Sequence, residues 1–523
     1  MEMTAKITTV PAPSGGINAY DNLAAMPATD AIRLMNLIAQ PYGCTVRKGY
    51  RAHATGMPGP VESLSSWISF AGAQKFFAFS DNKMYDITAV GAVGAPLLSG
   101  FAQDFWQSVA MVNAAGTWTV MFSGQDDPII YGSGGVARLT LGDGIVVNTI
   151  AGIDPSTLIQ GTVHQRRLWA VAINSTKGWY LPPDQIYGTM ASFDFGPQFK
   201  RGGYLSTLAT WTVDAGGGSN DYLVAVSSNG EAAVYGGLNP ASAADWALVG
   251  VYFIGQPPRG RRYMCNVAGD LYYLTLTGVV SMATLVTSTQ VNVAANNTYS
   301  QKIAFMLSEL IVDLQDIEGW EIDFFPAPNL LFINVPTVYS GGNGQIVANH
   351  ITTAWCTFSG FNARTWHRIE GQPYFGDPDG TVWRALYGDK DGTDTLGEGG
   401  TNILSSVQQA YSSFGMPTAQ KQVGMYRMTF MGARPVGYAS IVTYDYAQTT
   451  SPDATGSGVS GAFSHWDEAL WDVGLWSGGL SVQRDWRSAA GMGTTAALSA
   501  NLSTEAEATW VSTDYTLRTG GPL

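Results

Sequence analysis

The stretch Tyr222–Tyr235 reads YLVAVSSNGEAAVY and has the pattern of a β-hairpin. An alternating apolar run meets Ser-Ser-Asn-Gly, and a second alternating run follows. Asn229 and Gly230 favour the two positive-φ positions of a tight turn, whose twist then matches that of the flanking strands. The sequence therefore predicts two antiparallel strands joined at Asn229-Gly230.

The same pattern recurs along the chain. Clear copies lie at Phe76–Ile87, Leu271–Met282 and Tyr374–Trp383, and looser copies at Trp118–Tyr131, Leu168–Leu181 and Leu330–Ile346. Their turns are spaced by roughly 40 to 60 residues, which is the period of a propeller blade of four short strands. An ordinary β-sandwich would show turn signals every ~8–12 residues without this longer period. We therefore expect an all-β chain with a β-propeller of about six to seven blades.

The segments that flank the propeller differ from it in their sequence pattern. Residues 1–60 are expected to form an N-terminal arm and a short helix, because Thr29-Asp30 precedes a dense apolar run through Ile38. Residues 61–418 are assigned to the propeller. Residues 419–523 contain the alternating runs MYRMTFMG and YASIVTYDY, which predict a C-terminal β-sandwich or barrel-like domain.

Two further features stand out against the strand pattern. Ser300–Leu314 (SQKIAFMLSELIVDL) has apolar residues at helical spacing behind a candidate Ser300 cap, so a helix inserted near 300–314 is expected. Trp466, Trp471 and Trp476 recur at five-residue spacing. That spacing fits neither one helix face nor one strand face, so these rings are read as core or interface residues.

The composition describes a large protein with few charges and many rings. Charged residues make up 13% of the chain, against a usual ~25%, and aromatic residues make up 12%. The net charge is -13. A protein that grips nucleic acid by neutralising phosphates is normally basic, so tight DNA binding is not expected. An acidic wall that surrounds DNA without gripping it remains compatible with this charge.

Cysteines and apolar runs bear on the compartment. Cys44, Cys265 and Cys356 are too far apart in the sequence to form a metal motif or a redox pair, and buried thiols in a reducing cytosol are expected. The N-terminus MEMTAKITTVPAPSGG has no apolar signal region, and no run approaches the ~18 residues of a membrane span. We expect a soluble protein that does not enter the membrane.

Catalytic motifs are missing from the sequence. It contains no G-x-S-x-G elbow, Walker loop or H-E-x-x-H, so no enzyme and no cofactor are expected. The run from Asp389 to Asp394 (DKDGTD) is similar to a calcium loop, but its glycine comes fourth instead of sixth, which favours a solvated acidic turn. Asp377–Trp383 (DPDGTVW) is similar to the Asp-box of sialidase propellers, and an Asp-Gly turn ahead of a strand explains the same residues.

Three basic clusters are the candidate interface or phosphate-contacting residues. They are Arg166-Arg167, Lys200-Arg201, and Arg259 with Arg261 and Arg262. In a chain with so few charges, pairing with carboxylates between blades or subunits is the favoured interpretation. Contact with phosphate groups is the alternative.

Four stretches together resemble the tail nozzle proteins of short-tailed bacteriophages, also called tail tubular protein B. They are PAPSGGINAYDNLAAMPATDAIRLMNLIAQPYGCTVRKGY at Pro11–Tyr50, WYLPPDQI at Trp179–Ile186, the segment Phe193–Gly237, and WDEALWDVGLW at Trp466–Trp476. These motifs fall in all three parts of the chain and in the order of the family.

The resemblance implies a β-propeller with additional β regions, assembled as a homo-hexamer around the tail axis. It implies a virion protein that is assembled in the host bacterial cytoplasm, binds a tail adaptor protein and contacts tail fibres. Genomic DNA would pass through the lumen, and no catalytic residues are implied. The alternative is a carbohydrate-binding or depolymerising phage propeller (adhesin), which needs paired carboxylates or a tryptophan platform. A cytosolic scaffold propeller is a third class.

Overall fold

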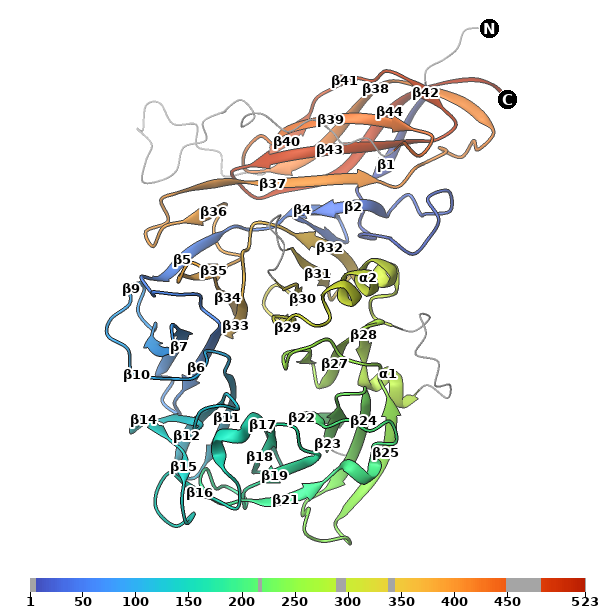
Figure 1. The fold of residues 1–523 in the computed structure, drawn as a ribbon. Coiled ribbons are helices and arrows are strands. Elements are labelled where there is room, and N and C mark those ends of the chain that lie inside the picture. Colours follow the sequence, from blue (N-terminus) through green and yellow to red (C-terminus); the bar gives the residue numbers. More distant parts are fainter. Residues whose placement is uncertain (1–5, 215–218, 288–297, 337–343, 448–480, 523) are drawn as a thin grey trace.

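Seven small antiparallel sheets follow one another around a ring in the computed structural model, which describes residues 6–214, 219–287, 298–336, 344–447 and 481–522 (Figure 1). Further strands join the last two of them into one 14-stranded sheet. We number these sheets as blades 1 to 7. Blade 1 consists of β6 (Ser63–Ile68), β7 (Gln74–Ser80), β8 (Lys83–Asp86) and β10 (Leu98–Ser99). Blade 2 consists of β11 (Gln107–Asn113), β12 (Gly116–Phe122), β13 (Ile129–Gly132) and β14 (Gly135–Arg138). Blade 3 consists of β17 (Leu158–His164), β18 (Arg167–Ala172), β19 (Lys177–Tyr180) and β21 (Ala191–Asp194).

The ring continues through four more blades. Blade 4 consists of β22 (Leu205–Asp214), β23 (Ser219–Ser227), β24 (Glu231–Gly237) and β25 (Trp246–Phe253). Blade 5 consists of β26 (Met264–Val267), β27 (Asp270–Thr275) and β28 (Gly278–Ser281). Blade 6 consists of β29 (Glu321–Phe325), β30 (Leu330–Asn334), β31 (Gln345–Asn349) and β32 (Ala354–Phe358). Blade 7 consists of β33 (Thr365–Ile369), β34 (Gln372–Gly376), β35 (Val382–Ala385) and β5 (Tyr50–Thr55).

The first strands of the blades contact one another around the centre of the ring. β6 lies against β11, β11 against β17, and β17 against β22, which contacts β27. β26 then lies against β29, β29 against β33, and β33 returns to β6. The all-β fold is therefore a closed propeller, and its seven described blades confirm the predicted range.

Each of the seven hairpins predicted from the sequence is the second and third strand of one blade. Tyr222–Tyr235 forms β23 and β24 of blade 4, where Val224 lies opposite Val234. The turn differs from the prediction. Two residues with positive φ were expected, but Gly230 has a positive φ, of 81°, and Asn229 does not. The Gly230 N–H donates to the Ser227 carbonyl, so a three-residue loop ends on glycine instead of a two-residue turn.

The two-residue turn expected in blade 4 occurs in blade 1 instead. There Asp81 and Asn82 have φ values of 53° and 57°, as a tight turn with two left-handed residues requires. Glycine is needed at position 230 for a second reason, because a Cβ there would lie 2.4 Å from the Gly255 backbone. The hairpin signal was therefore right in both blades, while the turn type depended on contacts that are distant in sequence.

The C-terminal part of the chain forms a β-sandwich with strands from both ends of the sequence, as Figure 1 shows above the ring. One sheet contains β1 (Lys6–Pro11), β3 (Leu37–Gln40), β4 (Gly43–Val46), β38 (Ala419–Gly432), β40 (Ser481–Arg484), β41 (Arg487–Ser488), β42 (Met492–Gly493) and β44 (Ala508–Pro522). The facing strands are β2 (Ala31–Met35), β37 (Gly399–Gln409), β39 (Gly437–Tyr444) and β43 (Ala496–Thr504). Phe430 on β38 contacts Tyr438 on β39, with ring centroids 5.2 Å apart.

The short helix predicted after Thr29-Asp30 is wrong, because these residues form β2 and β3. β2 pairs with β37 on one side and with β32 on the other, and its residues Ala31 and Leu34 are buried. Asn36, with a φ of 58°, turns the chain between the two strands. Asp30 caps no helix and instead accepts hydrogen bonds from Asn18 and Lys302. Strand pairing therefore crosses the predicted boundaries near residues 60 and 418.

The remaining elements are short or inserted. The predicted helix near 300–314 is confirmed as α2 (Ala304–Leu314), which follows the 3-10 turn Gln301–Ile303 and buries Leu307 and Ile311. Ser300 does not cap it, because the Ser300 hydroxyl instead accepts a hydrogen bond from the Val279 N–H. The other elements are α1 (Met282–Thr287), β9 (Gly91–Ala92), β15 (Thr140–Leu141), β16 (Thr149–Ala151), β20 (Gly188–Thr189), β36 (Lys390–Thr393) and 3-10 turns at Pro155–Thr157 and Gly196–Gln198.

Other expectations have mixed outcomes. The predicted burial of the three cysteine thiols is confirmed. Trp466, Trp471 and Trp476 lie outside the described residues. No helix in the described ranges is long and apolar enough to cross a membrane.

A buried ion pair fastens the N-terminal segment to the ring and the sandwich. Arg47 is 1% exposed and donates to both carboxylate oxygens of Asp391, each at 2.7 Å. The same guanidinium donates to Asn36 and to the Ser359 carbonyl, and it lies 4.2 Å from the centre of the Phe361 ring. This one side chain therefore joins β2, β36 and the end of blade 6.

We predict that Arg47→Met lowers the stability of the chain by about 3–5 kcal/mol, because it leaves Asp391 largely buried without its partner. The measurement is the thermal and urea unfolding of both proteins. Arg166→Met is the matched control, since it breaks the exposed ion pair between Arg166 and Asp184 and should leave unfolding unchanged. Equal unfolding of the two variants would contradict this role of Arg47.

Candidate functional site at the propeller axis

The third basic cluster of the sequence lies at one end of the propeller axis. Arg259, Arg261 and Arg262 precede β26, the first strand of blade 5, and together with Arg364 they line a cavity of about 470 Å³. Glu318 and Glu321 line the same cavity. Because the first strands surround the axis, the leading ends of several blades meet here.

Arg262 bonds with four blades besides its own. Its guanidinium donates to the hydroxyls of Thr365 in blade 7 and Ser63 in blade 1, at 2.6 and 2.7 Å. It also donates to the Trp106 carbonyl beside blade 2 at 3.1 Å and to the Glu321 carboxylate of blade 6 at 3.4 Å. Since these blades lie on different sides of the ring, the Arg262 side chain crosses the axis.

The two neighbouring residues reach the remaining blades. Arg261 donates to the Ser123 carbonyl at the end of β12 at 2.7 Å, and to the Ile159 carbonyl of blade 3 at 3.4 Å. The Tyr263 hydroxyl donates to Ser206 of blade 4 at 2.7 Å. Three consecutive residues of blade 5 therefore bond with all six other blades.

Burial sets the electrostatics of this centre. It lowers the pKa of the Arg261 guanidinium, which nevertheless stays charged because free arginine titrates above pH 12. Burial also raises the pKa of Glu321, while the nearby Arg262 opposes that rise. Arg259 and Arg364 complete the cavity in ion pairs with Glu318 and Glu62. Of the cluster, Arg259 and Arg262 pair with carboxylates, whereas Arg261 donates to backbone carbonyls.

The other candidate residues lie away from the axis. Arg166 is in the turn between β17 and β18 and pairs with Asp184, and Arg167 lies over the Tyr180 ring at 5.8 Å. Lys200 is exposed, and Arg201 lies 3.8 Å from the centre of the Phe253 ring. These four residues belong to the region of blades 3 and 4, and their contact with phosphate stays a prediction.

Two residues of the centre were missed by the reading of the sequence. Tyr263 directly follows Arg261 and Arg262 and precedes the first strand of blade 5. Its position next to the basic cluster could have marked it as part of the same site. His367 of blade 7 shares a 2.8 Å hydrogen bond with the Ser66 hydroxyl of blade 1. Burial and the nearby Arg368 and Arg262 lower the pKa of His367 to about 4. No sequence pattern marked this histidine, because its partner is 301 residues away.

The two acidic motifs have structural roles. Asp391 of the calcium-like run pairs with Arg47, and Asp394 accepts hydrogen bonds from the N–H groups of Leu396 and Glu398. Within the part of the chain that the structure describes, no group of three or more potential metal ligands gathers. Asp377 of the Asp-box-like run accepts from the Asp379 and Thr381 N–H groups, so it builds the turn between β34 and β35 as predicted.

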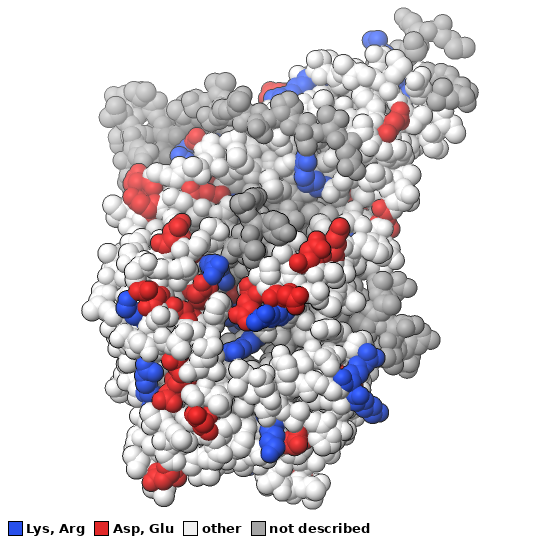
Figure 2. All heavy atoms as spheres, viewed as in Figure 1, with Lys and Arg blue, Asp and Glu red and all other residues white. Residues whose placement is uncertain are grey.

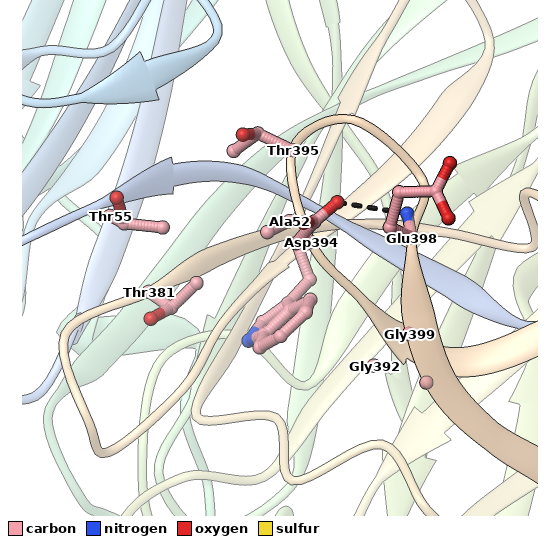
Figure 3. Close-up of a pocket in the computed structure, with 10 residues that line it drawn as sticks. Ala52, Thr55, Thr381, Gly392, Asp394, Thr395, Glu398 and Gly399 are labelled. Atoms are coloured by element: carbon pink, nitrogen blue, oxygen red, sulfur yellow. Dashed lines mark hydrogen bonds between the residues drawn. The ribbon is translucent and has the colours of Figure 1, made fainter.

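A second cavity, of about 600 Å³, lies at the outer side of blade 7 (Figure 3). Its walls come from β5, β35 and the loop that joins β36 to β37. Trp383 lines it together with Asp394 and Glu398. The axial cavity also combines tryptophans with carboxylates, but Arg259, Arg261, Arg262 and Arg364 line it too, whereas no basic residue of the described chain lines the cavity at Trp383.

Comparisons with known proteins add little to this geometry. No family model matches the chain, and no curated protein does. Similar solved structures include BBS1N in complex with ARL6DN (10% identity, 65% of this chain and 98% of that one, TM-score 0.39), YCF48 bound to D1 peptide (9%, 69% and 99%, 0.37) and the β-propeller domain of Myceliophteria thermophila Cps50 (Swd1) (10%, 64% and 99%, 0.38). At these scores they carry no argument about function.

We predict that His367 makes the stability of the ring fall with acid. Its pKa in the folded chain, about 4, lies below the value of about 6.5 for a free histidine, so the folded state binds protons less readily than the unfolded one. The contribution is complete above pH 6.5 and is lost as the pH falls towards 4, by up to about 3 kcal/mol. The measurement is urea unfolding at a series of pH values.

His367→Gln should flatten this part of the pH profile, because the titrating ring is gone. Ser66→Ala is the matched control: it removes the hydrogen bond but keeps the ring, so stability should fall while the slope between pH 6.5 and 4 remains. Parallel profiles for the parent chain and His367→Gln would show that His367 does not titrate in this way.

Proposed function

We propose that the chain is the tail nozzle of a short-tailed bacteriophage, a structural protein of the virion and not an enzyme. Six copies form a ring below the adaptor and the portal, bind the adaptor, contact tail fibres and need no cofactor. Genomic DNA is retained and then leaves through the lumen of this ring without tight binding. The ordered motifs from Pro11–Tyr50 to Trp466–Trp476 support the family, and the surface of the described chain supports its role in an assembly.

The geometric observation that carries the proposal is an exposed aliphatic loop between β15 and β16. Leu141, Ile145, Val146 and Val147 are 62%, 82%, 60% and 65% exposed. The loop is built firmly, since Asp143 accepts hydrogen bonds from the N–H groups of Ile145 and Val146. Isolated monomers rarely present such a group of aliphatic side chains, which favours a surface that a neighbouring subunit covers.

The closed axis of the propeller supports a DNA path outside the propeller in this proposal. Arg262 bonds with blades on different sides of the ring and fills the axis at that end. A DNA duplex cannot share this space with a guanidinium that is bonded to both walls. The conduit is therefore placed between subunits, with each propeller as one block of the wall.

The surface chemistry suits a wall that DNA passes without adhering. Charged side chains are sparse on the face shown in Figure 2, and most of that surface is neither acidic nor basic. Six copies would multiply the charge of -13 sixfold and repel phosphate groups. The second candidate function, a carbohydrate-binding phage propeller, is favoured by the cavity at Trp383.

We predict that the double variant Ile145→Asp, Val146→Asp forms at least tenfold fewer six-fold rings in the presence of the adaptor, because charged side chains would be buried at the contact between subunits. Electron microscopy and mass photometry of chain mixed with the adaptor complex measure the fraction of six-fold rings. Val90→Asp is the matched control, since Val90 is also 60% exposed but lies outside the loop. Rings formed equally by all three proteins would refute this contact, and a chain that never forms six-fold rings would refute the nozzle itself.

A further inference from the structure

The cavity at the outer side of blade 7 is an open hollow on the surface of the chain. Its volume of about 600 Å³ lies within the usual range for small-ligand sites. Strands β5 and β35 form one wall, and the residues from Gly392 to Gly400 form the other (Figure 3). Gly392, Gly399 and Gly400 carry no side chains that would fill the space between them.

Trp383 is fixed in the wall of this cavity before any ligand arrives. Its indole N–H donates to the Asp377 carboxylate at 2.6 Å. The Tyr50 ring meets it edge-on at 5.0 Å, and Phe375 lies nearly parallel to it at 6.4 Å. A half-buried indole positioned in this way can stack against a ligand without losing rotamer freedom.

Several polar groups that line the cavity have no hydrogen-bond partner among the described residues. The hydroxyls of Thr55, Thr381 and Thr395 line the cavity, and none has a hydrogen-bond partner among the described residues. The Glu398 carboxylate is exposed and likewise has no partner in the described chain. Threonine hydroxyls both donate and accept, while a carboxylate accepts, so this set matches the hydroxyl groups of a polyol.

The Asp394 carboxylate, the second one in the cavity wall, stabilises the loop between β36 and β37 through hydrogen bonds to its backbone. Asp394 accepts from the Leu396 and Glu398 N–H groups, both at 2.9 Å, and Figure 3 shows the latter bond. Arg51 donates to the Thr395 carbonyl in the same loop at 3.1 Å. The loop is therefore tied to β5, and Glu398 is left as the one unpaired charge of the cavity wall.

We propose that this cavity binds a saccharide, with one sugar ring stacked on Trp383 and its hydroxyls bonded to Glu398 and the three threonines. An anionic ligand is disfavoured by Glu398 and by the lack of basic residues in the lining. The site is independent of the nozzle role, because a single chain contains all of it.

The test uses the full chain in a bacterial glycan array, followed by saturation-transfer NMR with maltotriose and with each saccharide that the array identifies. Trp383→Ala should weaken binding at least tenfold, and Glu398→Gln and Thr381→Val should each weaken it severalfold. Trp486→Ala is the matched control, since it removes another partly exposed tryptophan, outside the cavity. Binding by this control should equal that of the parent chain.

Three results would overturn the proposal. They are an array without any bound saccharide, binding that Trp383→Ala leaves unchanged, and saturation of the cavity by lysine or butylamine in place of sugars. Circular dichroism of Trp383→Ala reports whether it folds. If it does not, Glu398→Gln and Thr381→Val decide, because both keep the shape of the side chain. Ring formation by the chain is scored separately, so failure of this site leaves the nozzle proposal intact.

Discussion

One guanidinium group crosses the centre of the propeller, and the arrangement of the seven blades depends on it. Arg262 donates to groups of blades 1, 2, 6 and 7, and its neighbours Arg261 and Tyr263 reach blades 2, 3 and 4. Isolated charges are costly to bury, and here the cost is offset by Glu321 and by several fixed oxygen atoms. Such a network favours one arrangement of the blades, because any slip of a blade leaves a partly buried cation with fewer partners.

The two ends of the chain impose a second constraint. β5, from the first sixty residues, completes blade 7 beside β35, and this pairing joins the start of the ring to its end. β1 and β4 pair with β44, the last strand of the sandwich. Long-range pairings of this kind form slowly, because the loop-closure entropy must be overcome before the contacts form. We therefore expect ring and sandwich to gain stability together, late in folding.

Local features of the fold could be predicted from the sequence, and features that depend on distant partners could not. The hairpins of all seven blades were visible because their strands and turns lie within about a dozen residues of each other. α2 was visible because Leu307, Ile311 and Leu314 repeat at helical spacing. The run through Ile38 forms two short strands instead of the predicted helix, because a short apolar run fits a strand and a buried helix equally well.

The centre of the ring shows the same limit. The Arg259–Arg262 cluster was noticed, and its pairing with carboxylates was the favoured interpretation, but nothing in the sequence said that it lies on the axis. Its partners Ser63 and Thr365 are 199 and 103 residues from Arg262. At Trp383, the turn of Asp377 could be predicted, whereas the cavity could not, because its two walls are distant in sequence: Arg51 of β5 and Thr395 of the loop after β36 are 344 residues apart.

Hydrogen exchange followed by mass spectrometry tests the central role of Arg262 most directly. Arg262→Lys keeps the positive charge but cannot reach four blades with one ammonium group. The account predicts that amide protection falls together in β6, β11, β29 and β33, which belong to four different blades. If the loss of protection is confined to β26 and its own blade, Arg262 does not hold the ring together, and the account is wrong.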